Sequence, residues 1–438
     1  MSTAESRTAE YDVVISGASV AGCAAAILLA RRGARVALLD RRSDPAAYKV
    51  LCTHYLQPCA LPVLKELDLV EALEEAGAVR NEARWYTRWG WIEPKPGPDG
   101  EPLPHAYNVR RQTLDRIVRE RAAATPGVDL LLGHTVVGLL RDGGRTTGVK
   151  ADCGGSGERE LRARVVVGAD GKDSATARLA GVPVKTHANE RFSYFAHFED
   201  LELVGGITQS WFLEPDMAYA MPNDGGVTVV AVIPSKERLP QFRADLEGAY
   251  LDFVRDLPEA PAVDRATRVS KIIGTVNYPL MSRRPASPGL ALIGDAALTS
   301  DPLWGVGCGW ALQSASWLAD VLAPVLAAAG GADEIDKALA GYGRRHRGAL
   351  RGHQHLIADY AKGRPFNAFE RLMFSAAARN DAMARHMHLF ASRLVGPLRF
   401  LNPGALLRAL WVNLTHRPTR PVPAPAPSGE SPRFRPVA

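Results

Sequence analysis

The sequence predicts an α/β fold built around a Rossmann-like dinucleotide-binding domain, and three glycine-rich turns carry this prediction. The turns begin at Gly17, Gly168 and Gly294, and each follows a short apolar run. A buried strand that ends in a glycine turn and leads into a helix is the unit that holds dinucleotide phosphates at the edge of a parallel sheet. Alternating apolar runs between the second and third turns predict a separate β-rich domain, and the residues after the third turn predict helices.

Residues 11–41 have the pattern of strand, turn, helix and strand. Residues 21–32 are rich in alanine and leucine, Gly33 stands where a helix end favours positive φ, and residues 34–39 form a second apolar run. The first N–H groups of this helix would face a pyrophosphate. Asp40 would accept a hydrogen bond from an adenosine ribose hydroxyl.

The first turn reads GASVAG, with Ser19 where the common pattern has its middle glycine. The residues expected at the pyrophosphate are Gly17, Ser19, Val20, Ala21 and Gly22. The serine hydroxyl could itself contact a phosphate oxygen. Taken alone, the turn is also compatible with an ordinary α/β connection.

Composition excludes several classes of protein. The chain has 438 residues, enough for two or three domains, with 23% charged and 46% hydrophobic residues. The net charge of +6 favours an anionic ligand or a basic surface. The basic residues are spread along the chain without a helix-turn-helix, zinc pattern or basic stripe, so no nucleic acid and no metal are expected as ligands.

Targeting and redox signals predict a cytoplasmic protein. The five cysteines show no CxxC spacing, which is typical of a reducing compartment. Residues 1–10 are polar and residues 417–438 are rich in proline, so both are expected to be disordered. No run approaches eighteen uninterrupted apolar residues, which predicts membrane contact that is peripheral at most. We expect a monomer or a homodimer.

The composition shifts along the chain predict three regions. A discontinuous dinucleotide-binding domain is expected in residues 11–82, 105–185 and 281–330. Residues 83–104 and 186–280 are expected to form the β-rich substrate domain. A helical C-terminal region is expected in residues 331–416.

Periodicity and turn residues place the remaining elements. They are a helix over residues 62–75, a hairpin and loop over 83–105, a helix that begins at 110–111, an antiparallel meander over 128–167, a helix near 240–256, and helices from Gly307 to about 413. The last segment is amphipathic. Burial against the dinucleotide-binding domain, rather than membrane docking, is expected for Leu401, Leu406, Leu407, Leu410 and Trp411.

Three motifs stand in a fixed order: GASVAG at Gly17, GADGKDSATAR at Gly168 and GDAALTSDPLWGVGCGW at Gly294. With them the chain resembles the FAD-dependent monooxygenases of the para-hydroxybenzoate hydroxylase type, in the wider superfamily of geranylgeranyl reductases and flavin-dependent halogenases. The resemblance covers about residues 11–321. It implies a glutathione-reductase-like FAD-binding domain and FAD as the cofactor.

The resemblance also implies roles for residues outside the first turn. Asp170 would lie where the FAD pyrophosphate and the nicotinamide cofactor pass, in a turn fixed by Ser174 and Arg178. Asp295 would accept a hydrogen bond from the ribitol chain. The remaining expected FAD contacts are a phosphate contact of Arg111, an adenine contact of the Val136 backbone, an adenosine-side contact of Arg41 and a phosphate contact of Lys49.

The loop before the last helix motif is expected to bring bare backbone to the isoalloxazine edge. Its residues are Pro302, Gly305, Val306, Gly307, Cys308 and Gly309. A helix that starts there would aim N–H groups at flavin N1 and O2, where negative charge accumulates on reduction. Cys308 could be a redox thiol. We favour a small residue whose N–H matters, because no second cysteine is near it in sequence.

Candidates for chemistry and substrate binding are fewer. His54 is the titratable group expected to act as general acid or proton relay. Trp304 is expected to place its ring beside the substrate. The strands of the substrate domain supply the candidate substrate contacts Tyr194, Trp211, Tyr219 and Met221.

The resemblance implies a monooxygenase that uses NADPH or NADH and O2. A flavin C4a-hydroperoxide would hydroxylate or epoxidise an apolar, aromatic or polyketide-like substrate of secondary metabolism. Leu298 stands where many members have histidine, so a geranylgeranyl-reductase-like enzyme stays an alternative. A halogenase, for which Lys49 could serve, and a non-catalytic flavin-binding protein are the others.

Overall fold

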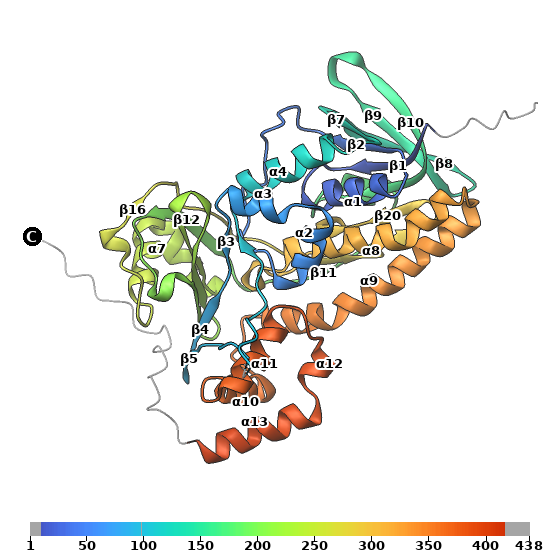
Figure 1. The fold of residues 1–438 in the computed structure, drawn as a ribbon. Coiled ribbons are helices and arrows are strands. Elements are labelled where there is room, and N and C mark those ends of the chain that lie inside the picture. Colours follow the sequence, from blue (N-terminus) through green and yellow to red (C-terminus); the bar gives the residue numbers. More distant parts are fainter. Residues whose placement is uncertain (1–9, 98, 417–438) are drawn as a thin grey trace, which may run out of the picture.

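The structure is a computed structural model that describes residues 10–97 and 99–416. The tail expected over residues 417–438 and all but the last residue of the expected leader lie outside the described residues. Figure 1 shows one sheet with its helices at one end of the molecule, a second sheet at the other end, and the C-terminal helices beside the second sheet.

Parallel strands form the centre of the first sheet, in the order β20–β10–β1–β2–β7. They are β20 (Leu290–Leu292), β10 (Glu158–Gly168), β1 (Tyr11–Ser16), β2 (Val36–Asp40) and β7 (Val128–Leu132). Strand β19 (Ala286–Ser287) adds an antiparallel edge beside β20. The predicted Rossmann-like α/β domain is confirmed. The segments of β1, β2, β10 and β20 that pair at the centre of the sheet are mostly apolar and buried, because both faces of a parallel sheet are covered.

Helices α1 (Val20–Arg31), α4 (Arg111–Ala123) and α8 (Gly307–Ala327) lie together on one side of this sheet. Helix α1 is buried along eleven of its twelve residues, which explains its alanine-rich sequence. The helix predicted over residues 62–75 is two helices, α2 (Leu61–Glu66) and α3 (Val70–Glu75). Asp68 separates them in a left-handed conformation with φ of 53°.

The predicted meander is partly confirmed. Strands β8 (Thr135–Asp142) and β9 (Arg145–Asp152) pair antiparallel, and β9 pairs with the first half of β10. Residues 128–132 do not belong to it, because they form β7 and pair parallel to β2. A five-residue apolar run does not reveal its partner, and this is why the sequence placed it wrongly.

The second sheet follows the order β16–β12–β15–β14–β13–β4–β5. The bounds are β16 (Thr267–Arg268), β12 (Ser193–Glu199), β15 (Thr228–Ile233), β14 (Met217–Pro222), β13 (Thr208–Phe212), β4 (Ala83–Thr87) and β5 (Gly90–Ile92). The predicted hairpin is β4–β5, and β4 joins the sheet parallel to β13. Helices α6 (Leu239–Ala244) and α7 (Leu246–Arg255) replace the single helix expected near 240–256, because Asp245 caps the start of α7.

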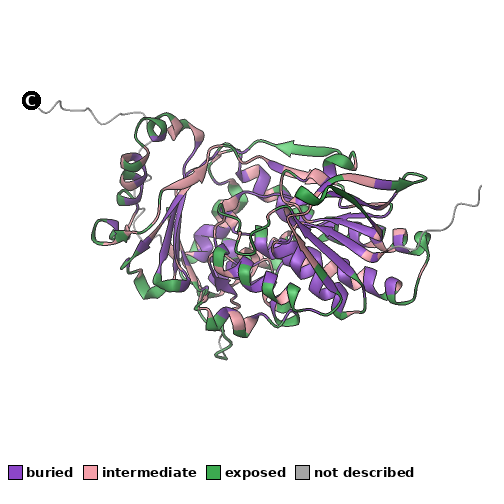
Figure 2. Cartoon of the chain, turned by 90° about the horizontal axis from the view of Figure 1, so that it is seen from above, coloured by how far each residue is buried: buried purple, intermediate pink, exposed green. Residues whose placement is uncertain are grey.

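Short elements connect the two sheets. They are β3 (Val79–Arg80), β6 (Tyr107–Asn108), α5 (Ala175–Leu179), β11 (Val184–His187) and β18 (Leu280–Arg283), whereas β17 (Ile273–Thr275) belongs to the second sheet and pairs antiparallel with β12. Figure 2 shows buried residues concentrated in the strands of both sheets and in the helices between them. The exact borders of the proposed domains stay a prediction.

The C-terminal region is helical, as predicted. Its helices are α9 (Ala332–Tyr360), α10 (Ala368–Ala377), α11 (Asp381–Ala391), α12 (Pro397–Phe400) and α13 (Pro403–Thr415). Helix α13 contacts α10 and buries Ala409 and Val412. The expected burial is wrong for three residues of its outer face, since Leu407, Leu410 and Trp411 are exposed. None of the helices in the described part of the chain is long and apolar enough to span a bilayer.

Candidate functional site

The three glycine turns meet at the carboxyl ends of β1, β10 and β20. A Cβ on Gly17, whose φ is 107°, would lie 2.5 Å from the carbonyl oxygen of Ala169. One on Gly22 would lie 1.8 Å from the carbonyl oxygen of Gly17, and one on Gly294 would lie 3.1 Å from the Ala21 Cβ. The backbone therefore approaches so closely that glycine is required at Gly17 and Gly22, and at Gly294 a side chain would be crowded and would have to adopt a φ of 55°.

The start of α1 lies beside the end of β2. The backbone N–H of Ala18 donates to the Asp40 carboxylate at 3.0 Å, and Ser19 precedes the helix without a side-chain cap. Burial alone would raise the pKa of Asp40, but hydrogen bonds from Arg42 lower it. Arg42, not the exposed Arg41, forms the ion pair with this carboxylate. A contact of Arg41 with adenosine stays a prediction.

Arg111 begins α4 and lies beside the first turn. Its Nη2 donates to the Ser19 Oγ at 2.7 Å, and its guanidinium forms a buried ion pair with Asp115. The backbone N–H of Lys49 donates to the same aspartate at 3.0 Å. The loop after β2, helix α4 and the first turn thus form one polar cluster, in which Arg111 supplies positive charge beside an uncapped helix start.

The third turn joins this cluster through Lys49. Its Nζ lies 2.8 Å from the Asp295 Oδ2, and this carboxylate raises the pKa of the lysine. Lys49 does not line the apolar cavity described below. Val136, on β8, is buried close to the carboxyl end of β2, where the His134 N–H donates to the Asp40 carbonyl at 2.9 Å.

The Asp170 carboxylate stabilises the second glycine turn through hydrogen bonds within that turn. It accepts hydrogen bonds from the Ser174 hydroxyl and from both the N–H and the hydroxyl of Thr176. Arg178 donates to the Asp173 carbonyl, so it holds the loop, as the sequence predicted. Contact of Asp170 with a cofactor stays a prediction.

The first turn of α8 has no side-chain cap and faces open space. A Cβ on Gly307 would have only the Asp295 Oδ1 near it, at 3.9 Å. By contrast, a Cβ on Gly305 would lie 2.9 Å from the Tyr55 ring, and one on Gly309 would lie 3.1 Å from Gln57. Pro302, Val306 and Cys308 complete this stretch.

These groups fit FAD. An uncapped helix start beside a buried arginine suits a pyrophosphate, and a carboxylate at a ribose or ribitol hydroxyl suits Asp40 or Asp295. The bare backbone at Gly307 leaves a cradle that a side chain would fill. Two helix starts and two carboxylates therefore provide the donors and acceptors that such a cofactor needs.

The fold also brings Cys52 next to Cys308. Interaction with the Cys308 thiol lowers the pKa of Cys52 well below its usual range, and interaction with Cys52 together with burial raises the pKa of Cys308. No second cysteine is near Cys308 in sequence, but the fold supplies one from the distant loop after β2. A role for its backbone N–H stays a prediction.

His54 lies at the junction of the two domains, not in the cavity. Its Nδ1 accepts the Arg111 N–H at 3.2 Å, and its Nε2 is buried without a partner in the described residues. Burial lowers the pKa of His54 to about 4. The ring is therefore neutral at neutral pH and would donate from Nε2, so a proton-relay role stays a prediction with this constraint.

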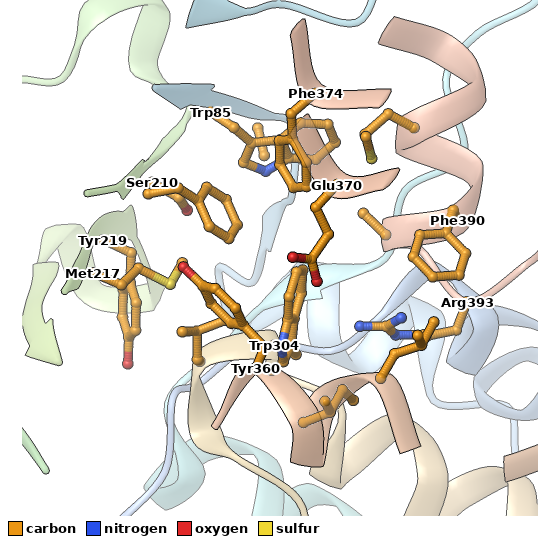
Figure 3. A pocket seen from close by; sticks show the side chains of 18 of the residues that line it. Trp85, Ser210, Met217, Tyr219, Trp304, Tyr360, Glu370, Phe374, Phe390 and Arg393 are labelled. Carbon is orange, nitrogen blue, oxygen red and sulfur yellow. The ribbon is translucent and has the colours of Figure 1, made fainter. Parts of the chain in front are cut away.

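A largely apolar cavity lies beside residues 302–305, between the second sheet and the C-terminal helices (Figure 3). Trp304 lines it, as do Tyr219 and Met221 of β14. Helices α9, α10 and α11 supply the opposite wall. Among the residues that they contribute are Ile357, Tyr360, Glu370, Met373, Phe374, Met387 and Phe390.

Tyr194 and Trp211 face away from this cavity. Tyr194 stacks on Phe242, and the Trp211 Nε1 donates to the Pro258 carbonyl at 2.7 Å. Both were expected to contact substrate and both instead lie in the core under α6 and α7. Because side chains alternate along a strand, only one face of each strand reaches the cavity, and the sequence did not say which.

Several residues of the site were missed by the sequence analysis. Arg191 and Asp301 form a fully buried ion pair at 2.9 Å, which ties the loop before α8 to the second sheet. Arg283 donates to the carbonyls of Lys172 and Ala296 and so links the second and third turns. Isolated arginines carry no motif, and only the folded chain reveals their partners.

Comparisons with known proteins agree with this geometry. The profile of a family described as FAD binding domain matches residues 10–348. The 6-methylpretetramide 4-monooxygenase of Streptomyces rimosus is 30% identical over 70% of this chain and 74% of its own. A digeranylgeranylglycerophospholipid reductase of Methanopyrus kandleri is 28% identical over 69% of this chain and 78% of its own. The structure of a flavin-dependent brominase has a TM-score of 0.72 at 17% identity, over 92% of this chain and 98% of the brominase.

Proposed function

This chain belongs to the FAD binding domain family and is an FAD-dependent oxidoreductase of the para-hydroxybenzoate hydroxylase type. From this premise we propose that it hydroxylates or epoxidises an apolar, aromatic or polyketide-like substrate. The observation that carries the proposal is the position of the cavity. Residues 302–305 line the apolar cavity, and the uncapped start of α8 follows them directly at Gly307, beside Asp295 of the third turn.

The proposal assigns FAD to the polar cluster. Gly17, Ser19 and Gly22, with Arg111, would hold the pyrophosphate, and Asp40 would hold the adenosine ribose. When bound and reduced by NADPH or NADH, FAD supplies the activation of O2 and the transfer of one oxygen atom.

The protein then contributes orientation and exclusion of water. Asp295 would accept from the ribitol chain, and the N–H groups at the start of α8, around Gly307, would stabilise negative charge at the flavin ring. The apolar walls at Trp304, Tyr219 and Met221 would hold the substrate out of water beside that ring. Lys49 would adjust the position of Asp295 through their ion pair.

The polyketide-like substrate class rests on the relative that carries 30% identity and whose name specifies a pretetramide. The cavity suits such a compound because its walls are predominantly aromatic and aliphatic. A prenyl double bond is the alternative substrate, since the reductase relative also covers most of this chain.

The test is a turnover experiment with the purified, FAD-loaded protein. NADPH or NADH, O2 and a panel of multi-ring phenols would be supplied, with a prenyl lipid as comparison. We expect substrate-stimulated oxygen consumption and a product heavier by one oxygen atom. Loss of a double bond without oxygen would instead assign the chain to the reductases. If no compound stimulates flavin reduction, the non-catalytic alternative gains support.

A further inference from the structure

The cavity contains a guanidinium group that has no counter-charge. Arg393 follows α11, and its Nη1 donates to the His353 Nδ1 at 3.1 Å. Its Nε and Nη2 are buried and have no hydrogen-bond partner among the described residues. Figure 3 shows the side chain at the cavity wall, and its guanidinium carbon lies 5.3 Å from the Trp304 ring and 5.5 Å from the Phe390 ring.

The groups around Arg393 do not neutralise it. Burial and Arg393 itself lower the pKa of His353 to about 3, so the histidine accepts the hydrogen bond in its neutral form. Among the described residues that line the cavity, Glu370 supplies the carboxylate, and it is already bound to Arg364 and to the Asn367 N–H. A buried cation that lacks an anionic partner is strongly unfavourable, so the pocket is electrostatically incomplete.

The backbone of Arg393 is also strained. Its N–H donates to the Phe390 carbonyl and the Leu394 N–H donates to the Leu389 carbonyl, which is the Schellman pattern that ends a helix. Arg393 occupies the left-handed position of that pattern with φ of 61°, where glycine is the usual residue. An arginine held there against its backbone preference points to a use for its side chain.

From these two observations we propose that Arg393 binds an anionic, planar oxygen group of the substrate, either a carboxylate or the enolate of a 1,3-dicarbonyl. The adjacent free N–H groups, Nε and Nη2, have the spacing of a fork that donates to two oxygens of one group. The Trp304 Nε1 is a further buried donor without a partner in the described residues, and it lines the same cavity. The inference rests on the proposed function, because it places the substrate in this cavity, and it makes that substrate acidic as well as multi-ring.

The test measures ligand binding without turnover, so its failure is separable from failure of the proposed oxygenation. Three bicyclic probes are titrated into the FAD-loaded protein near neutral pH: 2-naphthoate, its neutral carboxamide, and 2-acetyl-1,3-indandione as the enolate. Binding is followed by the change in flavin absorbance. The wild type is expected to bind at least one anionic probe about tenfold or more tightly than the carboxamide.

Two variants separate the charge from the backbone. Arg393→Met removes the guanidinium charge and its donors but keeps an unbranched apolar stem, whereas Arg393→Gly also relieves the left-handed strain. Both are expected to lose the preference for anionic probes and to bind the carboxamide as the wild type does. Arg393→Gly is expected to melt at the same temperature as the wild type or higher. Arg371→Met, at an exposed site on α10, should leave the preference intact.

Three results would overturn the inference. The first is a wild type that binds the carboxamide as tightly as both anions. The second is an Arg393→Met protein that keeps the preference. The third is loss of FAD from the Arg393→Met protein, which would assign Arg393 to the cofactor. Loss of preference for only one of the two anions would support the inference and identify which group is bound.

Discussion

The Lys49 ammonium lies 2.8 Å from the Asp295 carboxylate and joins the loop after the second strand to the third glycine turn. Lys49 is held at both ends, because its backbone N–H donates to Asp115 of α4 while its ammonium pairs with Asp295. One carboxylate therefore faces both a lysine and the open space in front of Gly307. This position suits an acceptor for a polyhydroxylated chain that passes along the start of α8.

Asp295→Ala is expected to lose FAD. The variant removes a charge-assisted hydrogen bond, worth roughly 1.5–3 kcal/mol, so FAD affinity should fall by about tenfold or more. The ratio of flavin to protein absorbance after gel filtration measures the loss. Asp320→Ala is the matched control, because Asp320 lies later on α8 and pairs with Arg32 and Arg345 outside the site. Full flavin occupancy in Asp295→Ala would reject the assignment.

Gly307→Val is expected to leave the fold intact but to impair the flavin reactions. The free protein has room for the new side chain, whose nearest neighbour would be the Asp295 carboxylate. That room is the proposed place of the flavin edge, so binding and the reductive and oxidative half-reactions should slow. Stopped-flow measurement of both half-reactions provides the readout.

Gly348→Val serves as the control for this change. Gly348 lies in α9, and a Cβ there would meet nothing within 4 Å. Both variants replace a glycine of a helix with valine, which has the higher helix propensity, so neither is expected to lose stability through helix propensity. Equal flavin rates in the two variants would show that the space at Gly307 is not used by the cofactor.

The first glycine turn, which is proposed to bind the cofactor, was largely predictable as a structure because much of its geometry is local. A Cβ on Gly22 would meet the Gly17 carbonyl oxygen within the same turn, and Asp40 ends the adjoining strand, whereas the contact that requires Gly17 is with Ala169 of the second turn. The spacing of such residues is written in a short stretch of sequence. The ion pair between Arg42 and Asp40 was not predictable in this way, because it depends on which of the two adjacent arginines, Arg41 or Arg42, turns its side chain toward Asp40.

The substrate end was less predictable because distant segments build it. Helices α10 and α11 fold back over the second sheet, and this places Arg393 beside Trp304. Their sequences reveal amphipathic helices but not what they cover. The contact between Cys52 and Cys308 was unpredictable for the same reason, because the two cysteines are far apart in sequence and form no recognisable motif.

Trp304→Phe is expected to weaken substrate binding without loss of FAD. The change removes the unpaired Nε1–H from the cavity but keeps an aromatic ring, while the Trp304 carbonyl still accepts from Gln57 at 2.6 Å. A lost hydrogen bond of about 1–1.5 kcal/mol predicts a rise of roughly tenfold in KM. Trp317→Phe, on the side of α8 that contacts His346, should change neither KM nor FAD content. A wild-type KM in Trp304→Phe would remove this tryptophan from the substrate site.

His346 is expected to make the fold sensitive to mild acid. Burial in α9 and the neighbouring Arg347 lower its pKa to about 4 in the folded chain, below the value of roughly 6.5 expected when unfolded. Between these values the unfolded chain binds a proton that the native chain does not, so the free energy of unfolding falls as pH drops through this window. The stabilisation is complete above about pH 6.5, and roughly 2 kcal/mol of it is lost by pH 5.

His346→Phe keeps the ring contacts with Tyr342 and Trp317 but does not titrate. Urea unfolding at both pH values should therefore show a smaller difference in His346→Phe than in the wild type or in His355→Phe, an exposed site on the same helix. If the free energy of unfolding changes equally between the two pH values in all three proteins, His346 is not the source of the pH dependence.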